Sequence, residues 1–237
     1  SGGGFGFGND ALKLSGVTMA GTITNTATGV ITGDYSGVRL DGGSTVAFLV
    51  NNGAISSVAT AVIVSDSGTV LSELRNESVG TISGQNDSAI SVRNGALIGQ
   101  LTNHGTLTSS GAGVFVDNAG ITALVNSATG QVQAQHGIEI QADGIVGSII
   151  NAGHLNGTGT GLRLYAGVVS GTVTNSASGV ITGASEAGIS MGTFATASQI
   201  RDIINQGRIE GSVGIDGHEG SVITHGIHNH GTIDGVS

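Results

Sequence analysis

Three histidines near the C-terminal end of the chain are spaced as metal ligands can be. His225, His228 and His230 lie in the stretch THGIHNHG. Residues two apart on a β-strand point to the same side, so His228 and His230 form a potential zinc-binding pair. However, the chain has no cysteine, and His230 occupies a position after an asparagine that His104 fills elsewhere. We therefore favour a solvated histidine cluster, with no metal and no other cofactor.

Carboxylates are the second source of possible chemistry. A glycosidase needs two acids roughly 5–10 Å apart. Glu139 corresponds in the sequence repeat to Arg163, 24 residues later, and not to another acid. We interpret these two as a stacked surface ion pair worth under ~1 kcal/mol. Asp66, Asp117 and Asp143 fall in predicted loops at related positions. A patch of these carboxylates is therefore kept as an alternative.

Two further motifs are close to known functional signatures. The stretch GISMG at 188–192 has the G-x-S-x-G form of a hydrolase nucleophile, but Ser190 falls within a predicted strand and not at a strand-to-helix turn. The stretch GGGFGFGND at 2–10 is close to a calcium-binding repeat, but it occurs once and its aspartate is displaced. We expect neither a catalytic serine nor a calcium site, and we interpret residues 1–10 as a flexible entry segment.

The elements that position these residues follow from an internal repeat. An aliphatic residue, any residue and then asparagine recur nine times, 23 to 30 residues apart. A glycine follows each asparagine after two or four residues, and an aliphatic residue comes two residues after that glycine. The recurring asparagines are Asn25, Asn51, Asn76, Asn103, Asn126, Asn151, Asn175, Asn205 and Asn229.

Each repeat contains three short apolar segments. One precedes the asparagine, one follows the glycine, and the third has the form small-aliphatic-x-aliphatic, as in GVRL or GVFV. Alternation over three or four residues between glycines and asparagines is typical of short strands. Three strands in each repeat of about 24–25 residues predict a parallel β-helix of nine to ten coils.

The repeated residues have structural roles in such a solenoid. The aliphatic side chains stack inward as a narrow core. The asparagines bond the backbone and one another from coil to coil, and the glycines permit a positive φ or a tight bend. The absence of proline is consistent with strands that are hydrogen-bonded on both sides.

Composition excludes several other functions. The net charge of −9 disfavours nucleic acid and anionic membranes as partners. No apolar run approaches the roughly 18–20 residues that span a bilayer, so we expect no membrane-spanning segment. Without cysteine there is no disulfide framework. We interpret the chain, 1–237, as a single β-helix segment of a longer protein.

The N-x-G-x-I coils, together with the richness in Gly, Asn, Thr and Ser, resemble passenger domains of Gram-negative autotransporters, from about Leu12 to Ile233. The resemblance implies a right-handed β-helix at the bacterial cell surface, anchored by an outer-membrane barrel outside this segment. Many such passengers are adhesins or autoaggregation factors. We expect a host protein, a host glycan or a second copy of the chain as partner.

Candidate binding residues are those predicted to face outward on the third strands. Phe115, Glu139 and Arg163 occupy equivalent positions in successive coils, and Tyr165 follows the third strand. Phe194 lies in the longest interval between asparagines, where we expect a protruding loop at 192–200. The sequence thus predicts a non-enzymatic adhesin. The alternative is a carbohydrate-active β-helix enzyme of the polysaccharide lyase or glycosidase kind.

Overall fold

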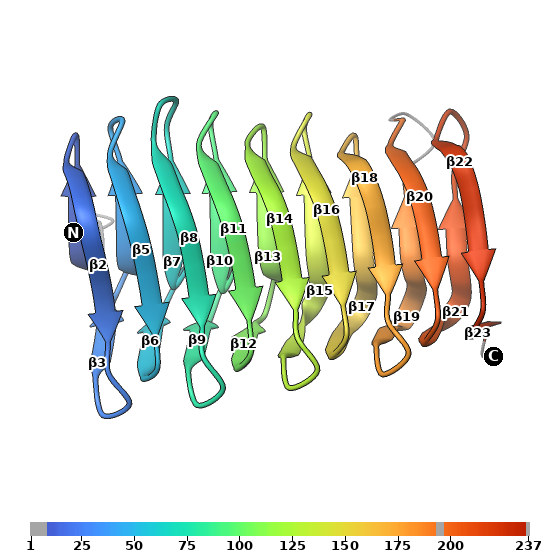
Figure 1. Cartoon of the computed structure of the whole chain (residues 1–237), viewed down its shortest axis with the longest axis horizontal. Helices are drawn as coiled ribbons and strands as arrows, with labels where there is room; N and C mark the ends of the chain where they lie inside the picture. The colour runs from blue at the N-terminus through green and yellow to red at the C-terminus, as the bar shows by residue number, and fades with distance from the viewer. Residues whose placement is uncertain (1–8, 193–196, 236–237) are drawn as a thin grey trace, which may run out of the picture.

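The computed structural model describes residues 9–192 and 197–235. Its elements in this part of the chain are all β-strands, wound into a rod of about nine coils (Figure 1). In the figure the near strands run downward and the far strands upward while the chain advances from left to right, so the winding is right-handed. The predicted parallel β-helix is therefore confirmed.

One face of the rod is a parallel sheet of nine strands, each of which ends at a repeated asparagine; we call it the Asn sheet. Its strands are β2 (Thr18–Asn25), β5 (Thr45–Asn51), β8 (Val70–Asn76), β11 (Leu97–Asn103), β14 (Gly120–Asn126), β16 (Ile145–Asn151), β18 (Val168–Asn175), β20 (Gln199–Asn205) and β22 (Val222–Asn229).

The other two strands of each coil form two further rows in the N-terminal half. The second-strand row consists of β3 (Val30–Gly33), β6 (Ala54–Ser57), β9 (Thr81–Gly84) and β12 (Thr106–Ser109). The third-strand row consists of β1 (Asp10–Ser15), β4 (Ser36–Asp41), β7 (Val62–Ser65), β10 (Ile90–Arg93) and β13 (Ala112–Asp117). Asp10 thus belongs to a strand and not to the predicted entry segment, whose residues 1–8 lie outside the described part.

The two rows join in the C-terminal half, which the repeat did not predict. Each coil there has one long strand that serves both rows: β15 (Gln131–Gln141), β17 (His154–Tyr165), β19 (Val180–Met191) and β21 (Arg208–Gly217). A short strand, β23 (Thr232–Gly235), follows. The shift of register between neighbouring long strands falls at the corner between the rows.

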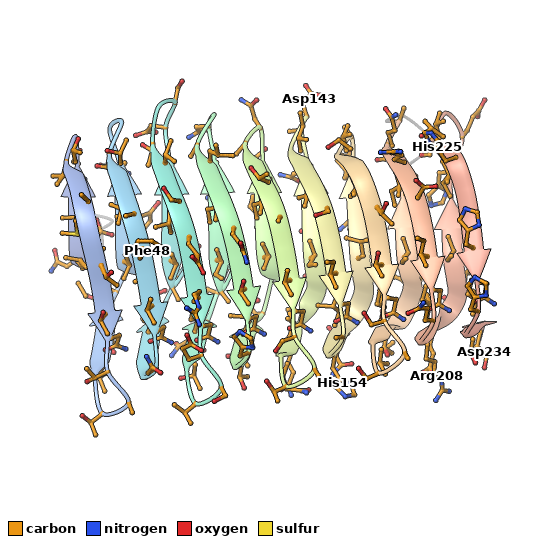
Figure 2. The ribbon with its side chains drawn as sticks, in the orientation of Figure 1. Phe48, Asp143, His154, Arg208, His225 and Asp234 are labelled. Carbon is orange, nitrogen blue, oxygen red and sulfur yellow. The ribbon has the colours of Figure 1, made fainter. Side chains whose placement is uncertain are left out.

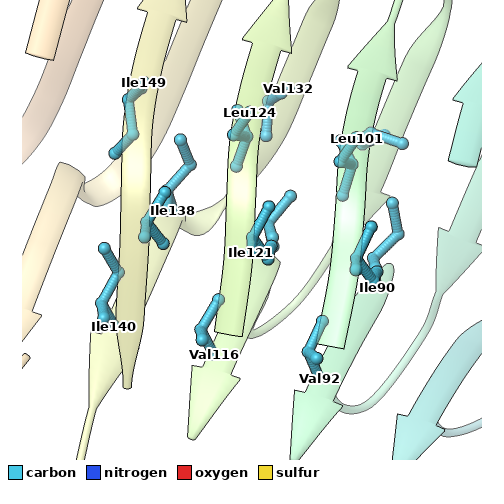
Figure 3. Packing of buried hydrophobic residues seen from close by; sticks show 14 of the residues in the cluster. Ile90, Val92, Leu101, Val116, Ile121, Leu124, Val132, Ile138, Ile140 and Ile149 are labelled. Carbon is cyan, nitrogen blue, oxygen red and sulfur yellow. The ribbon is translucent and has the colours of Figure 1, made fainter. Parts of the chain in front are cut away.

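The core is a set of aliphatic ladders, one residue from each coil. Leu101, Leu124 and Ile149 are in register and fully buried, and Val92, Val116 and Ile140 form a second ladder opposite (Figure 3). Burying each such side chain contributes about 1.5–3 kcal/mol. Because parallel neighbours lie about 4.8 Å apart, every inward residue of the inner coils is covered above and below by its equivalents.

The repeated asparagines form a continuous hydrogen-bonded column along the inside of one corner. Each Nδ2 donates to the Oδ1 of the asparagine in the next coil at 2.8–2.9 Å, from Asn25 through to Asn229. The same Nδ2 also donates to backbone oxygens, such as Gly80 O for Asn76. Interior members of this column are buried, so these residues hold the coils in register.

The glycine after each asparagine has a different role from the positive φ that we allowed for. None of these glycines has a positive φ; that conformation occurs instead in the turns after the third-strand row, at residues such as Asp66 and Asn94. A Cβ on Gly105 would lie 2.2 Å from Gly80 O and 2.4 Å from Glu77 O. Glycine is required here because the backbones of adjacent coils approach closely.

Candidate functional site

The outward side chains of the third-strand row lie one above the other along the rod, and we call them the third-strand column. The backbone register places them in the predicted order, with Lys13 added at the N-terminal end. The column is Lys13, Arg39, Ile63, Ser91, Phe115, Glu139, Arg163, Ser190 and Asp216. No two acids are adjacent in it, so its carboxylates are not positioned as a catalytic pair by the sheet itself.

Phe115 is held in a polar network and is half-buried. The Arg93 guanidinium lies 5.1 Å from the centre of the Phe115 ring, donates to Ser91 Oγ, and pairs with Asp87 Oδ2 at 2.7 Å. Burial opposes ionisation of Asp87, but hydrogen bonds from Thr60 and Arg93 outweigh it and lower the pKa of Asp87. The aromatic ring is therefore presented in one fixed position beside an ion pair.

Arg163 connects most of the remaining predicted site. Its Nη1 lies 3.6 Å from Glu139 Oε1 and 2.9 Å from His136 Nε2, and its guanidinium lies 5.8 Å from the Tyr165 ring centre. The predicted stacked pair of Glu139 and Arg163 is thus present. The structure brings Glu139, Arg163 and Tyr165 together, with Phe115 next to Glu139 in register.

His136 is the buried partner of this group, and the sequence analysis missed it. Its side chain accepts from Arg163 through Nε2, which places the ring proton on Nδ1. That Nδ1 is buried and has no hydrogen-bond partner among the described residues. Burial, followed by the positive charge of Arg163, lowers the pKa of His136, while Glu186 opposes the shift. His136 is therefore held neutral.

The pKa of the Glu139 carboxyl group is raised. Burial raises its pKa, Arg163 lowers it, and the acids Asp87, Glu186 and Asp117 raise it further. Asp117, the last residue of β13 and not a loop residue as predicted, is thus the one of these acids whose charge acts on this site. Asp66 lies in the turn after β7, and Asp143 lies in the turn after β15. A carboxyl group with a raised pKa is a feature of binding and catalytic sites alike.

A polar pocket of about 370 Å³ lies beside Arg163, where the long strands shift register. Its lining includes Arg163, Glu186, Ser190, Asp216 and His218. Glu186 lies in the extra residues of β19 at the corner and accepts a hydrogen bond from Thr160. Ser190 lies in a strand, as predicted, between Arg163 and Asp216 in register, so it has no nucleophile turn around it.

The histidine cluster is not assembled into a ligand set. His228 belongs to β22 and lies 4.0 Å from Asp202, and His230 follows the end of that strand. His225, which is labelled in Figure 2, lies in the same strand and contacts Thr224. Within residues 9–192 and 197–235, no group of three or more histidines and acids is arranged to hold a metal. Phe194, the remaining candidate, and residues 193–196 of the predicted loop at 192–200 lie outside the described residues. The end of that predicted loop is wrong, because β20 already begins at Gln199.

Four functional candidates, His136, Glu186, Arg93 and Asp87, did not come from the sequence pattern. All four lie at the corner or at a strand end beside the third-strand column, where the residue type changes from coil to coil, as from Ser65 to Arg93 to Asp117. In the sequence His136 is marked only by its place immediately before the third-strand motif that begins at Gly137, where the register shifts.

Comparison with known proteins identifies no relative: no family model, no curated protein and no solved structure matches the chain. In the described parts of the chain there is no helix of sufficient length and apolar character to cross a membrane.

Proposed function

We propose that this chain is a non-enzymatic binding rod of the bacterial cell surface, part of an autotransporter passenger that mediates adhesion. The observation that carries the proposal is the third-strand column from Phe115 to Asp216. It is an outward row of one aromatic, three ionic and one hydroxyl side chain that continues over five coils. An elongated row suits an extended macromolecular ligand better than a small substrate, because contacts repeat from coil to coil.

The pairing of charges in and beside the third-strand column supports binding over catalysis. Glu139 pairs with Arg163, and Asp87 pairs with Arg93. Glycoside hydrolysis requires two facing carboxyl groups, and no two acids are adjacent in the third-strand column. Phe115 and Tyr165, each beside a guanidinium, offer the rigid aromatic contacts that dominate binding energy in interfaces.

The test is to display the chain on a non-adherent bacterium and to score attachment to host cells and extracellular matrix, and also clumping. The double variant F115A/Y165A removes the aromatic contacts, and we expect it to lower attachment or clumping at least tenfold. The matched control is Phe48→Ala, because Phe48 is 41% exposed on the Asn sheet, away from the third-strand column (Figure 2). Equal attachment by both variants and the parent would exclude the third-strand column as the binding surface.

The raised pKa of Glu139 and the acids of the polar pocket favour one second candidate, a carbohydrate-active enzyme. This alternative predicts that the purified chain shortens a polysaccharide and that Glu139→Gln abolishes the activity. The control Glu77→Gln changes an acid that pairs with Arg75 beside the Asn sheet. Depolymerisation without any attachment would replace the adhesin proposal with this one.

A further inference from the structure

A second pocket lies on a different part of the rod, where the second-strand row meets the corner. It has a volume of about 540 Å³ and is lined by residues of β12, β15, β17 and β19. Its floor includes the buried residues Ala134 and Gly157, and its walls include Gln133, Gln135, Asn156 and Thr182. This amide pocket shares no lining residue with the polar pocket beside Arg163.

Two of its amide side chains lie in neighbouring coils at the same position. Gln133 is paired in register with Asn156, and Asn156 with Thr182, so the three outward side chains follow one another along the rod. Gln135 adds a third amide from the same strand as Gln133. The pocket thus repeats a similar polar group once per coil, about every 4.8 Å.

These side-chain amides do not contribute to the hydrogen bonding that holds the coils together. The side chains of Gln133, Gln135 and Asn156 make no hydrogen bond to any other described residue, in contrast to the repeated asparagines inside the rod. Earlier in the same outward row, the hydroxyl groups of Thr32 and Ser56 bond to each other. The amides therefore keep both their donors and their acceptors for a ligand.

The lining of the amide pocket carries no charge, although the chain has a net charge of −9. The next residue of the row after Thr182 is Glu210, followed by Asp234, so acidic groups begin one coil beyond the pocket. An uncharged pocket with an acidic neighbour disfavours anionic ligands, and it offers no carboxylate to a cationic one. These features favour a ligand with hydroxyl groups and no net charge.

We propose that the amide pocket binds a neutral oligosaccharide that lies along the rod. Adjacent hydroxyl groups of a sugar each donate and accept, which matches the paired donor and acceptor of a side-chain amide. The apolar floor and the small residues accommodate the C–H face of a pyranose ring. A repeat of one polar group per coil lets successive sugar units make similar contacts. The site is independent of the proposed function of the third-strand column.

The test is binding of the purified chain, displayed as a multimer, to an array of neutral gluco-, galacto- and manno-oligosaccharides together with sialylated and sulfated glycans. We expect the chain to bind a neutral glycan. The double variant Q133A/N156A should give at least a tenfold lower binding signal for that glycan. The matched control is S56A/S83A, which changes outward residues of the same row in coils nearer the N-terminus. The control should stay within twofold of the parent.

Folding of each variant is checked by thermal unfolding, and little change is expected because the two amides make no internal hydrogen bonds. A further variant, Thr182→Arg, places a bulky cation over the pocket without removing an amide, and it should reduce neutral-glycan binding to a similar extent. The proposal is overturned if the array shows no neutral ligand or if Q133A/N156A binds like the parent. Binding of acidic glycans alone, lost on Arg163→Ala, would point to the third-strand column and also overturn it. Such a result would leave the adhesin proposal intact.

Discussion

Asn103 illustrates how much stability one buried amide in the asparagine column contributes. It accepts from Asn76 and donates to Asn126, both at 2.9 Å. We expect Asn103→Ala to cost roughly 2–6 kcal/mol, because two buried polar groups lose their partners at about 1–3 kcal/mol each. The control Asn229→Ala alters an exposed terminal member and should cost under about 1 kcal/mol. Urea unfolding of both variants measures the difference, and equal midpoints would contradict a structural role for the column.

His136 gives the stability of the rod a dependence on pH. Burial and Arg163 lower its pKa below the usual 6.5, so the folded chain binds a proton less readily than the unfolded chain. The contribution of His136 is therefore fully present above pH 6.5 and is lost as the pH falls through the folded-state pKa. We expect the melting temperature to fall between pH 7.5 and pH 5.5, and to fall less in His136→Gln.

The control for this pH dependence is His104→Gln, at a partly exposed corner position. Glu139 acts in the opposite direction, because a carboxyl group with a raised pKa stabilises the folded chain as the pH falls toward 4.5. The His136 effect should therefore be measured above pH 5.5. An unchanged pH profile in His136→Gln would show that the histidine is not held neutral in the folded chain.

At the scale of single turns, the glycine after each asparagine determines how closely two coils approach. We expect Gly105→Ala to destabilise the chain by roughly 3 kcal/mol or more, because the new methyl group would clash with backbone oxygens of the preceding coil. The control is Gly21→Ala, where an added Cβ would meet no atom within 4 Å. Thermal unfolding of the two variants distinguishes a packing effect from a general cost of replacing glycine. Similar losses of stability in both would contradict the role of Gly105 in the close approach of the coils.

The strand pattern was predictable wherever the period of the repeat was maintained. The third-strand column from Arg39 to Asp216 follows the predicted order because each motif begins with the same small-aliphatic pair. The joining of the second- and third-strand rows from β15 onward was not predictable, since it depends on corner residues with no repeating pattern. The same reason explains why Glu186 was missed: it lies in the extra corner residues of β19.

For the whole molecule, each coil is stabilised mainly by its two neighbours, so stability varies along the rod. Leu101 in a central coil is 1% exposed, whereas the equivalent Ile227 in the last coil is 46% exposed. We expect amide hydrogen exchange of this chain to be slowest in β11, β14 and β16 and fastest in β1 and β22. Uniform protection from end to end would contradict this, because it would require all coils to open together.

The asparagine column also has a net dipole along the axis of the rod. All eight links run the same way, with each nitrogen toward the C-terminal neighbour, so the amide dipoles are parallel and add along the axis. Such aligned hydrogen bonds polarise and strengthen one another. Among the described residues, the line begins at the Oδ1 of Asn25, which accepts from no other asparagine of the column, and ends at the Nδ2 of Asn229, which donates to none. Only a coil whose amide has the same orientation could therefore continue the line.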